Sequence, residues 1–444
     1  MSLLPRLAIG SAHPGVDPQP ACWALLALLS DRGQQVRHFH SMATFPRLDG
    51  ARAATGSSSR HLDSWLMTPE VCRETFAHGA ANASLTIVDG RYVQAQEQSW
   101  SGGQLDELSD WLDLPRIAVV DAAQIRDCCL PERPRHIDSL LLDNVDGLSQ
   151  FARLQTILEA VWKIPVLGAL ESQRSVRESL AALPPGSTPA PQLCQRLAAG
   201  LQRYLRIDRL RELAARRPFP LVRPYLFRTE ECDRVTNVTV AIAFDEAFRC
   251  YFPDALELFE LAGATVVDFS PLRDESLPPD VDLVYLGCGH PERHARELAE
   301  NHCMRLALRE HLCAGRRIYA EGGGLAYLCE HLVTPTGDQF PMVGLFPAVA
   351  AANPRPRPPA PVSLTIGQKC WLGRPGTKIR GYLNSNWILQ PTGKLNGVPT
   401  EPEHTLDLLS RNLAIGSRLH TNVVPQPDLL QSFLQPRQMS QATC

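Results

Sequence analysis

The sequence lacks the features that would assign it to several specialised classes. No apolar run approaches the roughly 18 residues that a membrane-spanning helix needs, and the first residues, MSLLPR, contain no apolar signal-peptide core. The thirteen cysteines include an adjacent pair, Cys128 and Cys129, but no Cys-x-x-Cys motif and no zinc-ligand spacing. These absences predict a protein of the reducing cytoplasm without a disulfide or zinc scaffold.

An excess of charge of either sign is also missing. The chain has 44 basic and 47 acidic residues, a net charge of -3, which gives no reason to expect nucleic acid or an anionic membrane as a partner. Its 444 residues are too many for one hydrophobic core and predict two domains of about 200 residues each. A homo-oligomer is compatible with the sequence, which leaves the oligomeric state open.

Short apolar runs alternate with helical patterns along the chain. In the first half the apolar runs are 7–9, 85–88, 117–120 and 140–142, and the helical patterns include 21–31 and 149–162. A Pro/Gly/Ser loop at 183–191 and a charged helical stretch at 193–216 precede a second alternation, which begins near residue 235 and comprises 238–242, 255–262, 266–267, 284–286 and 318–319, with a proline-rich loop at 354–361. Apolar strands between helices predict two α/β domains with mostly parallel sheets covered on both faces.

The first predicted strand leads into a loop at the place where an α/β domain binds phosphate. A phosphate loop needs flexible glycines, converging N–H groups, a Lys for the β- and γ-phosphates and a Ser or Thr for Mg²⁺. Here the loop GSAHPGVDPQP offers Gly10 and Gly15, but its three prolines remove N–H donors and Asp17 adds a negative charge. The residues therefore disfavour the usual mode of ATP binding and favour a simple strand-to-helix turn.

Two glycine-rich turns follow strands in the second half. The segment IYAEGGGL has the strand, sharp turn and helix of a nucleophile elbow, but Gly322 provides no nucleophile at its apex. Gly287 and Gly289 could present N–H groups to an oxyanion. Cys288, with His290 nearby, is an alternative nucleophile, although a small buried thiol is the favoured interpretation.

Three aspartates, Asp63, Asp89 and Asp121, end or follow apolar segments. Carboxylates bind Mg²⁺ or substrate at such positions in open α/β sheets, and helix caps or solvated turns explain them equally well. His420 is unremarkable by itself.

The order of these motifs resembles that of the cobyrinic (and hydrogenobyrinic) acid a,c-diamide synthases. ATGSSSRHLDSWLM at 54–67 is similar to the family's ATGxPSRNLDxWMM, and further matches follow in family order at 244–248, 251–253, 269–272, 285–292, 318–328 and 341–344. The resemblance extends from about Leu3 to Leu434. It implies an N-terminal P-loop-type domain, like dethiobiotin synthetase, that uses ATP and Mg²⁺ to activate the a- and c-carboxylates of a corrin precursor of cobalamin. It also implies a C-terminal class I-like glutamine amidotransferase domain that releases ammonia with a Cys–His pair.

The resemblance also shows which family residues are missing. The nucleophile of the family's ECGG is Gly322 here, whereas His420 matches the catalytic His of YLHxHF. The family's GHEFHYS corresponds to GYLNSNW at 381–387, which keeps only the glycine. The Lys of GVGKTT becomes Pro18 and the Mg²⁺-binding Thr becomes Gln19.

The acidic positions of the synthetase domain are lost in part. Both carboxylates of the family's PDYID are absent at 43–47. Asp89 keeps the first acid of EGVMGLYDG and Gln96 replaces the second, while Asp63 and Asp121 persist. Mg²⁺ is expected from the family, but no complete set of ligands can be assigned to it here.

The domains implied by the resemblance are an amidation domain at 1–200, a helical linker at 201–234 and an amidotransferase-like domain at 235–436. Losses in both sites favour a non-catalytic homologue, a binding or regulatory scaffold whose expected ligands are a corrin-type molecule or glutamine. The alternatives are an active synthase that uses free ammonia or a rearranged nucleotide site, and new chemistry in the old cleft.

Overall fold

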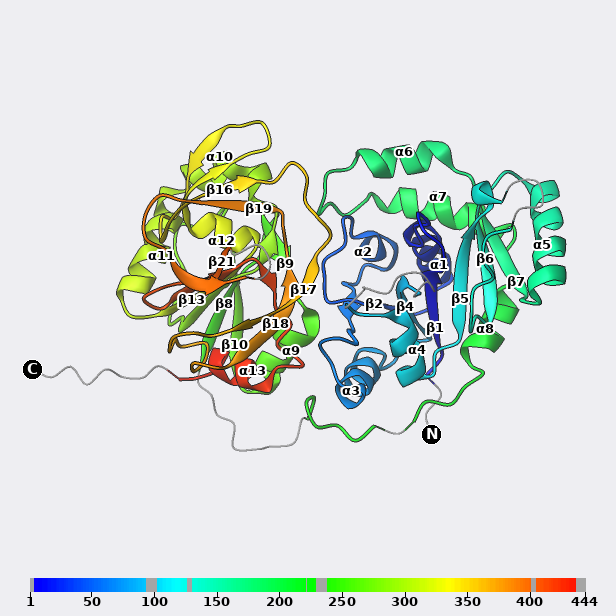
Figure 1. Cartoon of the computed structure of the whole chain (residues 1–444), viewed down its shortest axis with the longest axis horizontal. Coiled ribbons are helices and arrows are strands. Elements are labelled where there is room, and N and C mark those ends of the chain that lie inside the picture. The colour runs from blue at the N-terminus through cyan, green and yellow to red at the C-terminus, as the bar shows by residue number, and fades with distance from the viewer. Residues whose placement is uncertain are drawn as a thin grey trace, which may run out of the picture. The chain divides into compact units, whose positions relative to one another are not determined.

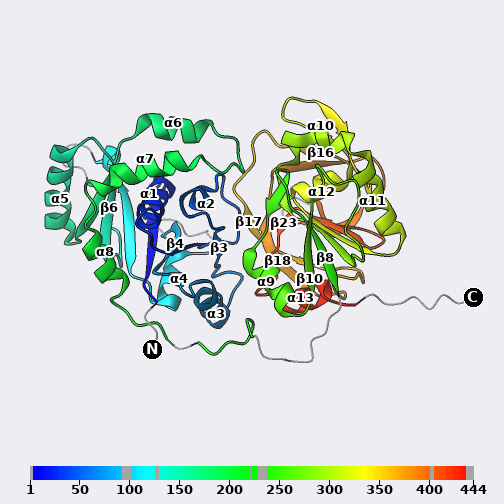
Figure 2. The same cartoon turned by 180° about the vertical axis from the view of Figure 1, so that it is seen from behind.

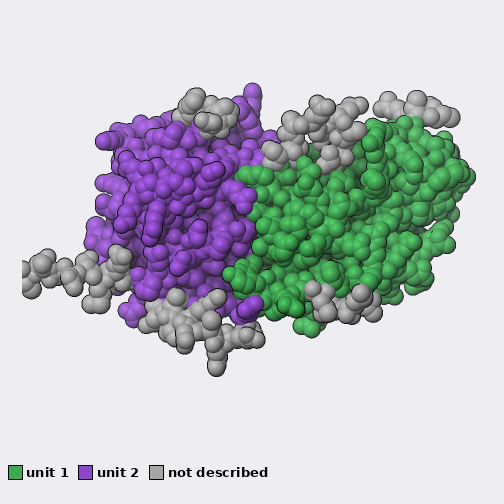
Figure 3. Space-filling view, turned by 60° about the horizontal axis from the view of Figure 1, so that its bottom comes forward, with its two compact units in different colours: residues 1–227 green, residues 228–444 purple. Residues whose placement is uncertain are grey.

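The computed structural model describes residues 4–92, 102–125, 130–220, 222–228, 238–400 and 405–436. The chain forms two compact units, Met1–Phe227 and Arg228–Cys444, which are green and purple in Figure 3. Both units are α/β, as the alternation of apolar runs and helical patterns predicted. The division falls inside the segment expected to be a linker, because helix α8 (Ile207–Ala214) buries Leu210 and Leu213 in the core of unit 1.

Unit 1 is built on one seven-stranded sheet in the order β3-β2-β4-β1-β5-β6-β7, in which every neighbouring pair is parallel. Helices flank the sheet in both views (Figures 1 and 2). The strands are β1 (Arg6–Ser11), β2 (Val36–His40), β3 (Arg60–His61), β4 (Leu85–Arg91), β5 (Arg116–Asp121), β6 (Ser139–Val145) and β7 (Val166–Glu171). The carboxyl ends of parallel strands meet at one edge of the sheet, where ligands bind in open α/β folds.

The other helices of unit 1 are α1 (Gln19–Ser30), α2 (Gly50–Thr55), α3 (Pro69–Gly79), α4 (Leu105–Leu112), α5 (Leu148–Trp162), α6 (Arg174–Ala182) and α7 (Pro191–Gln202), with a 3-10 turn, η1 (Ala122–Gln124). Helix α1 is apolar on every side, and all ten of its residues from Pro20 to Leu29 are buried. It packs against α2 and α7. The stretch expected to be helical at 193–216 forms two helices, α7 and α8, separated by a short break.

Unit 2 has a seven-stranded sheet in the order β10-β8-β11-β13-β22-β21-β20. The pairs from β10 to β22 are parallel, and β21 and β20 add antiparallel pairs. These strands are β8 (Thr239–Ala243), β10 (Thr265–Phe269), β11 (Leu283–Leu286), β13 (Arg317–Glu321), β20 (Asn396–Pro399), β21 (Leu406–Arg411) and β22 (Ala414–Ser417). The helices are α9 (Pro253–Leu261), α10 (Ala295–Glu300), α11 (His302–Cys313), α12 (Gly323–Leu328) and α13 (Pro427–Phe433), with a 3-10 turn, η2 (Pro291–His294).

Smaller sheets in unit 2 contain strands that the sequence patterns did not predict. They are β9 (Phe248–Cys250), β12 (Cys288–Gly289), β14 (Cys329–Val333), β15 (Gln339–Pro341), β16 (Phe346–Ala352), β17 (Ala360–Thr365), β18 (Lys378–Leu383), β19 (Trp387–Pro391) and β23 (Leu419–His420). Strand β16, FPAVAAA, is rich in alanine and alternates between buried and half-buried positions, so it has no long apolar run. The loop expected at 354–361 is shorter than predicted, because its last two residues begin β17.

Among the described residues, no helix combines the length and the apolar character that a membrane crossing requires.

Candidate functional site

Unit 1 contains a cavity of about 530 Å³ at the carboxyl ends of β2 and β4. The loop before α1 lines one side with Gly15, Asp17 and Gln19, and His40 and Asp89 line another. Gly15 has a φ of 72°, a left-handed conformation that glycine adopts without strain. The cavity therefore lies at the first strand-to-helix turn, the place where an α/β domain binds phosphate.

The start of α1 does not offer phosphate the donors that it would need. The Asp17 carboxylate accepts a hydrogen bond from the Gln19 backbone N–H at 3.0 Å, so it takes the place of an anionic ligand there. Pro18 and Pro20 have no N–H to donate. The residues present thus do not fit Mg·ATP bound in the manner of a phosphate loop. Gly10 contributes close packing, because a Cβ there would lie 2.8 Å from the Gly90 carbonyl oxygen.

Asp89 is the one predicted aspartate that lines this cavity. His40 Nδ1 lies 2.7 Å from its Oδ1, and His38 Nε2 lies 3.6 Å from its Oδ2. Burial opposes ionisation of Asp89, but the charges of His40 and His38, with the hydrogen bond from His40, outweigh it and hold its pKa well below the usual range. Burial lowers the pKa of His40 as well, but the Asp89 carboxylate outweighs it and the net shift is upward. For His38 burial dominates and the pKa is lowered.

Asp63 and Asp121 make local structural contacts instead. The fully buried carboxylate of Asp63 accepts backbone N–H groups from Ala43, Trp65 and Leu66 at 2.9 to 3.0 Å. Asp121 accepts the N–H of Ala123 at 2.9 Å at the start of η1, and an amide N–H of Asn144. The three aspartates lie near the same edge of the sheet, but these hydrogen bonds engage two of them in turns.

The nucleophile-elbow shape in unit 2 is present in the backbone. Gly322 follows β13 and precedes α12 with φ 50° and ψ -107°, and its N–H donates to the Ser417 carbonyl at 2.8 Å. A Cβ at this position would lie 3.1 Å from the sulfur of Cys288. The Cys288 thiol thus faces the apex of the turn, the position that the resemblance aligns with a nucleophilic Cys.

Glu321, next to Gly322, lies in a buried polar network. Its Oε1 accepts the Tyr319 hydroxyl at 3.0 Å and the Thr421 N–H at 3.3 Å, and Cys288 Sγ lies 3.9 Å from its Oε2. Burial raises the pKa of Glu321 to about 8. Burial, together with the nearby Glu321 carboxylate, also raises the pKa of the Cys288 thiol well above its usual value. Because the thiolate is the nucleophilic form, this environment opposes a catalytic role for Cys288.

His420 lies in β23, which pairs with β18 in a three-stranded sheet and follows shortly after β22, the neighbour of the strand that leads into Gly322. Glu321 pairs with Ser417 in the register of β13 and β22, and His420 follows three residues later in β23. Its Nε2 lies 2.8 Å from the side-chain nitrogen of Asn384. Burial lowers the pKa of His420 to about 4, which keeps the ring neutral near pH 7.

Gly287 and Gly289, which could present N–H groups to an oxyanion, are closely packed. The Gly287 N–H donates to the Tyr251 hydroxyl at 2.9 Å. A Cβ on Gly289 would lie 1.9 Å from the Ala247 carbonyl oxygen. Only glycine therefore fits here, because β9 and β12 pair closely at this point. His290 Nδ1 lies 2.8 Å from Glu292.

Sequence reasoning missed the histidines of β2. The strand reads VRHFH, which lacks an apolar run, so no strand was predicted there. The available signal was the alternation itself, since residues two apart on a strand share a face and place His38 and His40 together.

Comparisons with known proteins agree with this architecture. Residues 239–382 match the model of the CobB/CobQ-like glutamine amidotransferase domain. Proteins named cobyrinate a,c-diamide synthase are similar over most of the chain. The one from Syntrophotalea carbinolica is 30% identical over 362 residues, 77% of each chain. Those from Dehalococcoides mccartyi (27% identical, 97% of each chain) and Synechococcus sp. (28% identical, 98% of this chain and 99% of the relative) match nearly end to end.

Two solved structures also match parts of the chain. A glutamine amidotransferase crystal structure covers 44% of this chain and 96% of its own, at 16% identity and a TM-score of 0.35. The MinD cell division protein of Aquifex aeolicus covers 44% and 95%, at 10% identity and a TM-score of 0.29. On the sequence relatives, with their coverage of both units, the chain belongs to the cobyrinate a,c-diamide synthase family.

Proposed function

We propose that this chain is a non-catalytic member of its family, a binding or regulatory scaffold that retains the fold and a ligand cavity. The observation that carries the proposal is the elbow itself. Gly322 occupies the apex with no side chain, and the nearest thiol, Cys288, has a pKa raised by burial and by the adjacent Glu321. Release of ammonia from glutamine through a thioester requires a thiolate at this place.

The first strand-to-helix turn supports the same proposal independently. The Asp17 carboxylate already accepts the Gln19 N–H. Pro18 and Pro20, on either side of Gln19 at the start of α1, have no N–H to donate. A γ-phosphate needs donors and a cation where this turn presents a carboxylate. Activation of a corrin carboxylate with ATP and Mg²⁺, the reaction that the family resemblance implies, is therefore disfavoured.

The cavity supports a retained binding role. Its volume of about 530 Å³ lies in the range of small-molecule sites. The His40–Asp89 pair in its wall offers polar contacts for a ligand. Candidates by family are a corrin-type molecule in the synthetase unit and glutamine in the amidotransferase-like unit.

The test uses the purified full chain. Glutamate release, measured with and without cobyrinic acid, should equal the buffer rate, and calorimetric titration should give no Mg·ATP binding in the low micromolar range. Glutamate release at the rate of an active amidotransferase, abolished by Cys288→Ser but kept in Cys329→Ser, would overturn the proposal. Cys329 is the matched control because it is buried in the same unit and its thiol donates to the Leu325 carbonyl.

A second assay tests the alternative, that the chain is an active synthase that uses free ammonia. Replacing glutamine with an ammonium salt, in the presence of ATP and cobyrinic acid, bypasses the elbow and tests unit 1 alone. Formation of an amide product, detected by mass spectrometry, would establish an ammonia-dependent ligase with a rearranged nucleotide site. The proposal expects no product.

A further inference from the structure

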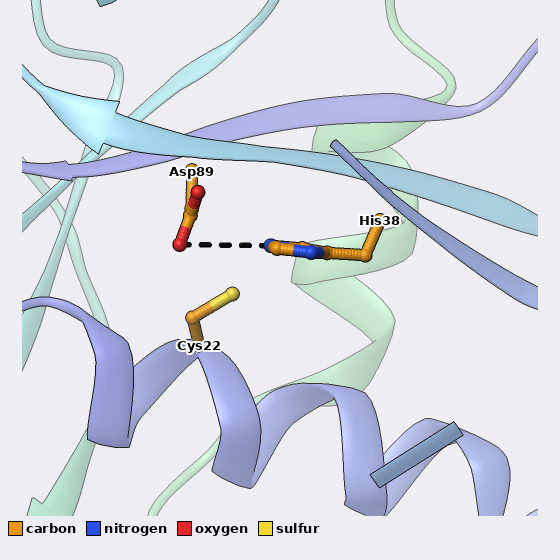
Figure 4. Close-up of side chains that lie close together, drawn as sticks. All are labelled: Cys22, His38 and Asp89. Atoms are coloured by element: carbon orange, nitrogen blue, oxygen red, sulfur yellow. Dashed lines mark ion pairs between the residues drawn. The ribbon is translucent and has the colours of Figure 1, made fainter. Parts of the chain in front are cut away.

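A compact group of metal-binding side chains lies beside the unit 1 cavity. Cys22, His38 and Asp89 are all buried, and one potential ligand atom from each lies within 4.8 Å of the other two. In Figure 4 the Cys22 sulfur, on α1, points toward the space between the His38 ring and the Asp89 carboxylate. The three residues are separated widely in the sequence, so no ligand spacing revealed them.

The fold explains why these side chains meet. In the pairing of β2 with β4, His38 lies opposite Ile87 and His40 opposite Asp89. Alternation along a strand puts His38, His40 and Asp89 on the face whose apolar members, Val36 and Ile87, pack in one core cluster with α1. Cys22 lies in the first half of that helix, within its ten consecutive buried residues. The cluster thus rests on rigid elements.

His38 is oriented as a metal ligand would be. Its Nδ1 lies 2.8 Å from the Ser59 hydroxyl, and its Nε2 has no hydrogen-bond partner although the side chain is only 2% exposed. That nitrogen faces Asp89 Oδ2 at 3.6 Å, which is longer than a hydrogen bond. Metal-bound histidines commonly make such a contact through the other ring nitrogen, which fixes the tautomer and aims the ring.

The carboxylate is supported in the same way. Asp89 Oδ1 accepts from His40 Nδ1 at 2.7 Å, while Oδ2 faces His38. A tetrahedral zinc ion holds its ligands at about 2.0 to 2.3 Å, and thus roughly 3.5 Å from one another. The observed separations of up to 4.8 Å need only a small side-chain adjustment.

We propose that Cys22, His38 and Asp89 bind a zinc-type divalent cation, with Ser59 and His40 orienting two of these ligands. A thiolate, an imidazole and a carboxylate together favour zinc over the Mg²⁺ of the family reaction, because magnesium prefers oxygen ligands alone. Asp89 also lines the cavity, which gives the ion a path of entry and leaves its fourth position for water or a ligand. This site is independent of whether the chain retains any amidation activity.

The experiment measures metal content and cobalt spectra of the full chain. Purified protein should contain about one zinc ion per chain. The chain loaded with Co²⁺ after removal of zinc should show the near-ultraviolet charge-transfer band of a cobalt–thiolate bond. Cys22→Ser should abolish the band, and His38→Gln should weaken zinc binding at least about tenfold. Cys194→Ser is the matched control, since Cys194 is buried in the same core and its thiol donates only to the Gly50 carbonyl among the described contacts.

A graded variant separates ligation from folding. Ser59→Ala removes the partner of His38 Nδ1 and should weaken zinc binding about tenfold while the cobalt–thiolate band remains. Ser57→Ala, whose hydroxyl accepts from Arg37, should leave zinc binding unchanged. Wild-type chain that holds no stoichiometric zinc and develops no band with Co²⁺ would overturn the proposal, leaving a hydrogen-bonded His–Asp pair. A band that survives Cys22→Ser in folded protein would overturn it equally.

Discussion

The two units differ in which part of each site the proposed loss of activity has changed. In unit 2 the backbone of the elbow is present and only a side chain is missing, at Gly322. In unit 1 the backbone itself is changed, because prolines remove donors and Asp17 binds one that remains. A missing side chain can be restored by one substitution, whereas a missing set of N–H donors cannot. We therefore expect substitutions that restore the elbow of unit 2 to recover more activity than substitutions that restore the phosphate loop of unit 1 recover ATP affinity.

The larger of the two repair effects is expected from Gly322→Cys and Cys288→Ala together, which restore a thiol at the apex of the elbow. The second change makes room, because a Cβ at 322 would lie 3.1 Å from Cys288 Sγ. Glutamate release should rise about a hundredfold over the wild-type rate, if His420 acts as the base. Adding His420→Gln should remove the gain. A folded double variant with no gain would show that unit 2 has lost more than its nucleophile.

The second prediction concerns Glu321→Gln and pH. Burial raises the folded-state pKa of Glu321 to about 8 from 4.5, so the folded state holds its proton more tightly than the unfolded state. This contribution to stability is complete below pH 4.5 and is lost as pH rises to about 8. This difference in pKa corresponds to about 5 kcal/mol.

The glutamine variant does not titrate, and its amide oxygen can still accept from Tyr319 and Thr421. Urea unfolding should therefore show that the free energy of unfolding of the variant rises relative to that of the wild type as the pH increases from 5 to 9. Parallel curves for the two proteins across this range would mean that Glu321 is not protonated in the folded state.

The third prediction contrasts two aspartates of unit 1. Asp63→Ala leaves three backbone N–H groups without their acceptor and should reduce the free energy of unfolding by about 3 kcal/mol. Asp121→Ala removes a cap from a short turn and should cost about 1 kcal/mol. Denaturant unfolding of unit 1 measures both. Equal losses would contradict the structural role assigned to Asp63.

The smaller of the two repair effects is expected from the phosphate loop, with Asp17→Gly, Pro18→Lys and Gln19→Thr combined. These changes remove the competing carboxylate and add a cation, but Pro20 still lacks a donor. Calorimetry should show Mg·ATP affinity improved by about tenfold, or about 1.4 kcal/mol. The single change Asp17→Asn is the control that reduces the charge alone. Micromolar affinity in the triple variant would mean that the backbone cradle is intact.

Sequence reasoning predicted the two α/β domains because apolar runs such as 85–88 are strong signals for buried parallel strands. It also placed Gly322 at a strand-to-helix turn, which the structure confirms. It could not assign the partners of Asp63, since a carboxylate that binds three backbone N–H groups looks the same in sequence as one that binds a metal. The cluster around His38 was out of reach because it depends on which face of β2 meets α1.

The burial of α1 from Pro20 to Leu29 also determines how this part of the molecule exchanges hydrogen with solvent. Ten consecutive buried residues leave no exposed face from which the helix could fray toward solvent. Its amide protons should be among the last in unit 1 to be replaced by deuterium, and they should exchange only through global opening of that unit. The exchange rate of this one helix would then report the stability of unit 1 without any assay of ligand or activity.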